Sequence, residues 1–155
     1  MTKKWNYKLY FGDLHFHTHY SDNRDFASIE EMMLAGANYG LSIFGTADHN
    51  HDLDLTRWRQ TQEETRILRE KYPDFLLMNN CEITFLLGHL NVLIPENIEG
   101  TIAEGYRYLY LEPNALKIIN HPYAFNDEWY KRILPDAIGV EVINGSVFTL
   151  SLIHI

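Results

Sequence analysis

The chain has 155 residues, which is enough for one domain and too few for two. Its composition, 46% hydrophobic and 22% charged, is that of a chain that buries a core, so a disordered or low-complexity chain is excluded. The formal net charge of −8 argues against a nucleic-acid partner, and bound cations would reduce it. With a single cysteine, Cys81, and no apolar run of membrane-spanning length, we expect a cytoplasmic protein without an internal disulfide or a membrane partner.

The hydrophobic pattern predicts strands that alternate with helices. We expect strands over residues 8–16, 41–47, 75–83, 89–94, 116–120 and 138–143, and helices starting at 28 and ending at 36 or 40, and over 56–72, 102–111 and 127–134. Ser28 and Glu31 have the spacing of a capping box, and Pro73 ends the second helix. This alternation favours an α/β fold with a mostly parallel sheet, open or closed into a barrel, in which ligands bind at the carboxyl ends of the strands.

The first polar motif is GDLHFH, residues 12–17, at the end of the first predicted strand. Because side chains alternate along a strand, Asp13, His15 and His17 are expected on one face. Two imidazoles two residues apart can share a metal ion, and a nearby carboxylate can orient a ring. The alternative is a polar edge strand. His19 lies beyond the predicted strand and is given no role.

A second polar cluster, ADHNH over residues 47–51, directly follows an apolar strand. That is the expected place for a functional residue in an α/β fold, and Asp48 is a candidate to fix the tautomer of His49. The alternative is a simple turn, which Asp and Asn favour. We expect His51 to be exposed to solvent.

Four further predicted strands have an acidic or imidazole group at or next to an end. Glu82 closes an otherwise apolar strand, where a buried carboxylate needs a partner, and its two oxygens can bridge two ions. His89 opens the next strand, and His121 ends another just before Pro122. The alternatives are a surface glutamate and a polar strand start. Glu141 and Asn144 end the last strand and are expected to be structural or to line a pocket.

Taken together, these segments predict a polynuclear metal centre. Each of them presents His, Asp or Glu near a strand end, and chance explains that agreement poorly. Nitrogen and oxygen ligands suit two or three divalent ions of zinc, manganese or iron better than a thiolate site does. Cys81 is not needed as a ligand.

In this order, the motifs of residues 12–22, 47–50, 82–84, 88–92 and 120–122 resemble the PHP (polymerase and histidinol phosphatase) superfamily, and most closely its CehA/McbA-type metallohydrolases. The resemblance implies a distorted, TIM-like (β/α)7 barrel that holds two or three metal ions and usually hydrolyses phosphoesters. It implies His15 and His17 on a first ion, Glu82 as the bridging carboxylate, His89 and His121 on a second ion, Asp22 and His49 on a third, and Asp13 and Asp48 as residues that orient ligands.

The chain departs from this family pattern in two places. Asn23 stands where the family often has glycine, which is a mild change because Asn tolerates left-handed turns. The family's late Asp-x-His pair does not follow Glu141. Since a closed barrel of this kind takes about 250 residues, we expect residues 1–155 to be a single PHP domain that is truncated at its C-terminus. We expect residues 146–155 to be a non-native tail in which His154 has no role.

The leading hypothesis for function is a metal-dependent phosphoesterase that uses a metal-bridging hydroxide on a small-molecule phosphoester or another ester. No general acid is assigned, and Arg24 is a candidate to bind substrate phosphate because it lies beside Asp22. One alternative is an amidohydrolase-type enzyme, whose barrels also open with His-x-His and often use a carboxylated lysine, here at best Lys117. Another is a non-catalytic, metal-binding fragment with an exposed sheet edge.

Overall fold

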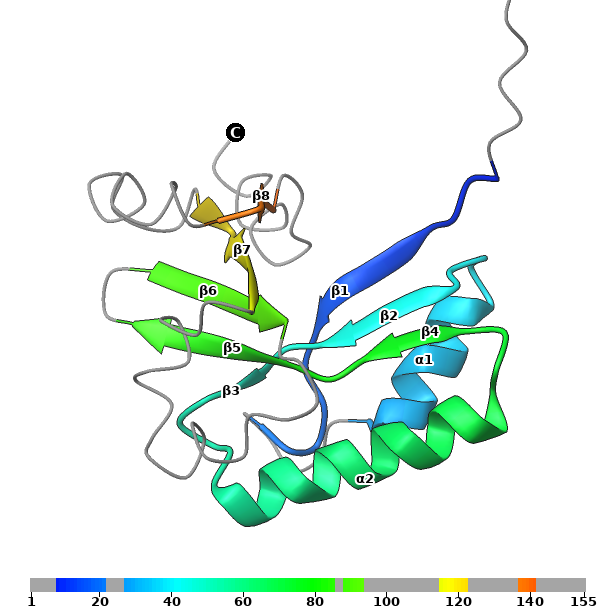
Figure 1. Cartoon of the computed structure of the whole chain (residues 1–155), viewed down its shortest axis with the longest axis horizontal. Coiled ribbons are helices and arrows are strands. Elements are labelled where there is room, and N and C mark those ends of the chain that lie inside the picture. Colours follow the sequence, from blue (N-terminus) through cyan, green and yellow to red (C-terminus); the bar gives the residue numbers. More distant parts are fainter. Residues whose placement is uncertain (1–7, 22–26, 86–87, 94–114, 123–136, 142–155) are drawn as a thin grey trace, which may run out of the picture.

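The computed structural model of the chain describes residues 8–21, 27–85, 88–93, 115–122 and 137–141. The helices predicted over 102–111 and 127–134 lie outside these ranges, as do the candidate residues Asp22 and Arg24. The elements, shown in Figure 1, are β1 (Gly12–Phe16), α1 (Ile29–Ala37), β2 (Ile43–Thr46), β3 (Asp48–His49), α2 (Leu55–Lys71), β4 (Leu76–Met78), β5 (Asn80–Phe85), β6 (Gly88–Leu93), β7 (Leu116–Asn120) and β8 (Gly139–Val140).

The described strands form two open sheets, in the orders β1-β2-β4 and β3-β5-β6-β7-β8. The predicted α/β class is confirmed, and within the described residues the strands do not close into a barrel. The first sheet is parallel, but β5 pairs antiparallel with β6, and β6 antiparallel with β7. Four of the six described pairings are parallel, as predicted, and β6 is the exception. It is antiparallel to β5 because only two residues separate the two strands and a parallel crossover needs a dozen or more.

The strand predicted over residues 75–83 is in fact two strands that belong to different sheets. It breaks at Asn79, so that β4 pairs with β2 while β5 pairs with β3 and β6. The segment that pairs with it breaks in the same way, between β2 and β3. Thr46 connects the two breaks, because its hydroxyl lies 3.2 Å from Asn79 Oδ1 and accepts from the Asn80 N–H at 3.1 Å. These side-chain hydrogen bonds stabilise the change of sheet.

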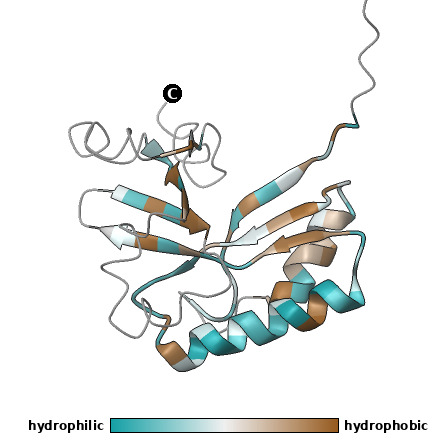
Figure 2. Ribbon diagram, viewed as in Figure 1, coloured by the Kyte–Doolittle hydropathy of each residue, from teal (hydrophilic) through white to brown (hydrophobic). Residues whose placement is uncertain are grey.

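Helices α1 and α2 cover one face of the β1-β2-β4 sheet (Figure 1). The predicted capping box is confirmed: Ser28 accepts from the Glu31 N–H, and the Glu31 carboxylate accepts from the Ser28 N–H at 2.8 Å. The first core lies beneath both helices and contains Phe16, Ile29, Met33, Phe44, Leu68 and Leu77. Figure 2 shows the contrast in hydropathy between the apolar strand β4 and the largely hydrophilic α2. No helix in the described part of the chain is both long and apolar enough to cross a membrane.

A second core lies on one face of the β5-β6-β7 sheet. Its buried residues are Leu53, Trp58, Cys81, Ile83, Leu90, Val92, Ala115 and Ile119. Because side chains alternate along a strand, the residues between them face the other way. That second face carries Glu82, Asn91 and Asn120, each at most 1% exposed. The alternation thus separates an apolar core from a buried polar face.

Candidate metal centre

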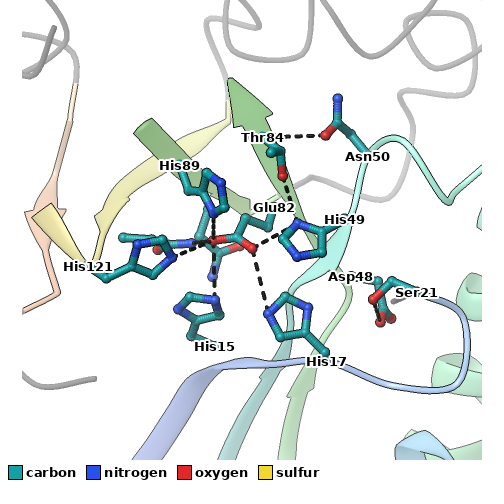
Figure 3. Close-up of polar contacts among 12 residues, drawn as sticks. His15, His17, Ser21, Asp48, His49, Asn50, Glu82, Thr84, His89 and His121 are labelled. Carbon is teal, nitrogen blue, oxygen red and sulfur yellow. Dashed lines mark hydrogen bonds and ion pairs between the residues drawn. The ribbon is translucent and has the colours of Figure 1, made fainter. Parts of the chain in front are cut away.

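The buried carboxylate of Glu82 lies at the centre of a cluster of five imidazole rings (Figure 3). It comes from β5, and Figure 3 shows the rings directed toward it from elements far apart in the sequence. The rings belong to His15 on β1, His17 just after β1, His49 on β3, His89 on β6 and His121 just after β7. The structure therefore brings together all the predicted histidine ligands and the predicted bridging carboxylate.

The two oxygens of Glu82 face different histidines. Oε1 lies 3.3 Å from His15 Nε2, 3.1 Å from His89 Nδ1 and 3.2 Å from His121 Nε2. Oε2 lies 3.0 Å from His49 Nδ1 and 3.6 Å from His17 Nε2. Two groups have ligand atoms close enough together to hold a cation: His15, Glu82 and His121, and His17, His49 and Glu82.

This grouping differs from the pairing that the family resemblance implies. The resemblance places His15 and His17 on the same ion, whereas the described residues place these two rings against different oxygens of Glu82. The reason is geometric, because β1 ends at Phe16 and His17 already lies beyond the strand. His17 stacks on His49, with ring centroids 4.6 Å apart, while His15 stacks on His121 at 5.6 Å.

The Glu82 carboxylate is held ionised by its surroundings. Burial by itself raises its pKa, but the hydrogen bonds from His121, His15 and His89 outweigh burial and hold the pKa well below the usual range. Asn120 adds a hydrogen bond, donating from Nδ2 to Oε1 at 2.7 Å. Oε2 is buried and accepts no hydrogen bond from the described residues.

That oxygen is the observation against which a metal can be tested. An ionised carboxylate oxygen that is buried without a hydrogen bond is costly unless a cation, either a metal ion or a protonated ring, compensates it. The donor set around Glu82 consists of imidazole nitrogens and carboxylate oxygens, which zinc, manganese and iron all accept. The residues present therefore fit a divalent metal ion on each side of Glu82.

A second carboxylate, Glu141, contacts the predicted ligand His15 at Nδ1, the ring nitrogen that does not face Glu82. Its Oε1 lies 3.0 Å from His15 Nδ1, and its Oε2 accepts from the His121 N–H at 2.7 Å. Burial lowers the pKa of His15, but the hydrogen bonds and charges of Glu141 and Glu82 outweigh burial and raise it to about 9. The predicted orienting residue Asp13 acts on the backbone, accepting from the His15 N–H at 2.9 Å.

Asp48 orients a loop instead of the ring of His49. Its oxygens accept from the Thr18 N–H at 2.7 Å, from the Thr18 hydroxyl at 2.8 Å and from the Ser21 hydroxyl at 2.8 Å. Adjacent residues of a strand point to opposite faces, so Asp48 and His49 diverge. His49 Nδ1 lies instead 2.7 Å from the hydroxyl of Thr84, whose N–H donates to Asn50 Oδ1. The expected contact between Asp48 and His49 is therefore replaced by Thr84.

Three residues that were given no ligand role, Cys81, His51 and His19, lie outside the two groups around Glu82. Cys81 is buried on the opposite face of β5 from Glu82, and burial raises the pKa of its thiol well above the ordinary value. The side chain of His51 is 57% exposed, as predicted, and lies 3.3 Å from Asp52 Oδ2. His19 packs beside the ring of Tyr20 at 4.2 Å between centroids. None of the three belongs to either ligand group of the described residues.

Sequence reasoning missed the role of Asn120 and the contact that Glu141 makes with His15. Asn120 precedes a predicted ligand at a strand end, and an asparagine that alternates with the apolar Ile119 was a signal that it faces the site. Glu141 lines a pocket together with His15 and Asn120, which agrees with its expected role. Its contact with His15 was not predicted, because nothing in the sequence connects residues 126 positions apart.

Comparison with protein-family models finds no match to this chain, and comparison with curated proteins finds none either. The site is therefore defined by its own geometry. It consists of histidine and glutamate groups, built around one shared carboxylate, that could hold metal ions.

Proposed function

We propose that this protein is a metal-dependent hydrolase of the PHP type that acts on small-molecule phosphoesters or other esters. The observation that carries the proposal is the sharing of Glu82, whose two oxygens face two separate histidine groups. A buried carboxylate with this arrangement suits a pair of neighbouring cations. The proposed fold is the distorted (β/α)7 barrel, supported by the parallel pairing of β1, β2 and β4 and by ligands that lie at the ends of β1 and β7.

Two divalent ions at this site would supply hydroxide near neutral pH and neutralise charge on phosphoryl oxygens. The chain's own contribution is to hold the ligands in place. Glu82 would be shared by the two ions, His15 and His121 would complete one group, and His17 and His49 would complete the other. His89 lies against the same Glu82 oxygen as His15 and His121 and would join their group. Asn120 and Glu141 would keep Glu82 and His15 oriented.

The amidohydrolase alternative finds less support in the geometry. Its carboxylated lysine would have to reach the centre, and Lys117 was the candidate. Lys117 lies on β7 three residues before Asn120, so alternation directs the two side chains to opposite faces. Asn120 reaches Glu82, and Lys117 is therefore expected to point away from it.

The proposal is tested by metal analysis combined with hydrolysis of 4-nitrophenyl phosphate. We expect the protein to bind two divalent ions, and the Glu82→Gln variant to lose both and to hydrolyse the ester about 100-fold more slowly or worse. Glu63→Gln is the matched control, because it replaces the same carboxylate by the same amide on an exposed face of α2. Metal binding without turnover would reject the hydrolase and favour a non-catalytic metal-binding protein. Full metal content in Glu82→Gln would reject the shared-carboxylate site.

A further inference from the structure

We propose that Glu141 is a positioning residue that couples two ligands of one metal ion, His15 and His121. The inference rests on the metal centre proposed above and concerns how one of its two halves is held together. Each carboxylate oxygen of Glu141 contacts a different member of the group formed by His15, Glu82 and His121. In the other group, His17, His49 and Glu82, the ring of His49 is instead contacted by the hydroxyl of Thr84, 2.7 Å from Nδ1.

The first contact selects the tautomer of His15. Its Nδ1 lies 3.0 Å from Glu141 Oε1, while its Nε2 lies 3.3 Å from Glu82 Oε1. A carboxylate can only accept a hydrogen bond, so Glu141 requires a proton on Nδ1. With that proton fixed, the lone pair of Nε2 is the one available to a cation beside Glu82. Glu141 therefore presents the correct nitrogen of His15 to the site.

The second contact fixes the backbone of His121. This residue has a φ of 27°, a left-handed conformation that costs a non-glycine residue about 1 kcal/mol or more. Glu141 Oε2 accepts from the His121 N–H at 2.7 Å and so holds the residue in this conformation. The ring of His121 then reaches Glu82, with Nε2 3.2 Å from Oε1.

Both contacts need two acceptors on one rigid group. Glu141 is itself anchored, because its N–H donates to the carbonyl of Ile119 on β7 at 2.7 Å. A glutamine of the same shape has one acceptor and one donor. It would either force the proton of His15 onto Nε2, the nitrogen that faces the metal, or give up the hydrogen bond to His121. Glu141→Gln therefore changes the chemistry of the contact and leaves its size almost unchanged.

The test is a competition titration of the full chain with Zn²⁺ alone, against a chromophoric chelator. Wild type is expected to bind two ions. In Glu141→Gln we expect one of them to bind about 10- to 100-fold more weakly while the other changes by less than about twofold. Glu63→Gln, exposed on α2, should behave as wild type. In a His15→Gln background the further change Glu141→Gln should cost much less, because the contact with the His15 ring is already absent and the new side chain can keep its one acceptor on the His121 N–H.

Each alternative result is decisive. Two unweakened ions in Glu141→Gln would overturn the inference and leave the proposed function standing, whereas a wild type that binds no Zn²⁺ would reject the proposed centre itself. Equal weakening of both ions, together with a lower free energy of unfolding, would show a general structural role instead. The ¹⁵N ring resonances of His15 in the Zn²⁺-loaded wild type give an answer that needs no variant. We expect a protonated Nδ1 and a metal-bound Nε2, and the opposite assignment would overturn the inference.

Discussion

The metal-free protein should lose stability as the pH rises from 6.5 to 8, and His15 is the expected cause. Its ring lies between two carboxylates, with Nε2 3.3 Å from Glu82 Oε1 and Nδ1 3.0 Å from Glu141 Oε1. These carboxylates outweigh the effect of burial and raise the pKa of His15 from 6.5 to about 9. A group whose pKa is higher in the folded state binds its proton more tightly there. Its contribution to stability is complete below the unfolded pKa of 6.5 and is lost as the pH rises through 9.

The expected loss follows from these two pKa values. Linkage over the interval from pH 6.5 to 8 gives about 1.5 kcal/mol, roughly half of the contribution of His15. Because m-values in urea are about 1–3 kcal/mol/M, the midpoint of unfolding should fall by about 0.5–1.5 M. Ending the interval at pH 8 keeps the contribution of Cys81 small, because a thiol with an unfolded pKa of about 8.5 is still mostly protonated there.

The assay is urea unfolding of protein treated with a chelator, at pH 6.5 and pH 8, for wild type and His15→Gln. The difference between the two proteins isolates His15 from the other histidines of the site. Wild type should lose about 1.5 kcal/mol more than the variant over this interval. With saturating Zn²⁺ the trend should reverse, because the metal must displace the proton and so binds more tightly at higher pH. Identical pH dependence in wild type and His15→Gln would refute the reasoning.

Three further predictions concern the scaffold. Cys81, buried with a raised pKa, should react with a thiol reagent only when the protein unfolds, so labelling of the native protein at pH 8 would contradict its placement. Ser28→Ala removes the hydrogen bond to the Glu31 N–H and should lower the free energy of unfolding by about 1 kcal/mol, with Glu63→Gln as a surface control in the same urea assay. Gly12→Ala should cost about 1–3 kcal/mol, because a Cβ there would lie 2.6 Å from the carbonyl oxygen of Ile43, and unchanged stability would show that β1 and β2 pair differently.

Much of the site could be predicted because its residues are His and Glu side chains on or directly after predicted strands. His121 directly follows β7, as expected, whereas Glu82, which was expected to close its strand, lies within β5 because that strand continues to Phe85. The ionised state of Glu82 also follows from its burial among potential donors. The spacing of His15 and His17 did not predict that their rings face different oxygens of Glu82, because that depends on the end of β1 at Phe16.

The strand break at Asn79 was not predicted, although Asn79 and Asn80 interrupt the apolar run of residues 75–83, because two polar residues alone do not distinguish a break from a polar position within one strand. Only the pairing partners distinguish its halves, and these lie far away in the sequence: β4 meets β2, while β5 meets β3 and β6. The role of Glu141 was hidden for the same reason, since its partner His15 is 126 residues away. Local sequence patterns predict which elements form and which residue types they present. The contacts between those residues depend on strand pairing between distant segments, which local patterns do not predict.

The same register explains why cations and stability should be connected in this fold. Where the chain changes sheets, β3 pairs with β5 so that His49 lies opposite Glu82, and β6 and β7 bring His89 and Asn120 into register with each other. The carboxylate is thereby fixed at a position with no exposure to solvent, and its charge must be compensated from within the ring of imidazoles. Below about pH 9 the proton on His15 can do so, but on Nε2 it occupies the nitrogen that a metal would use. As the pH rises through 9 that proton leaves and compensation of Glu82 is reduced, so a bound cation then contributes more to the stability of the fold.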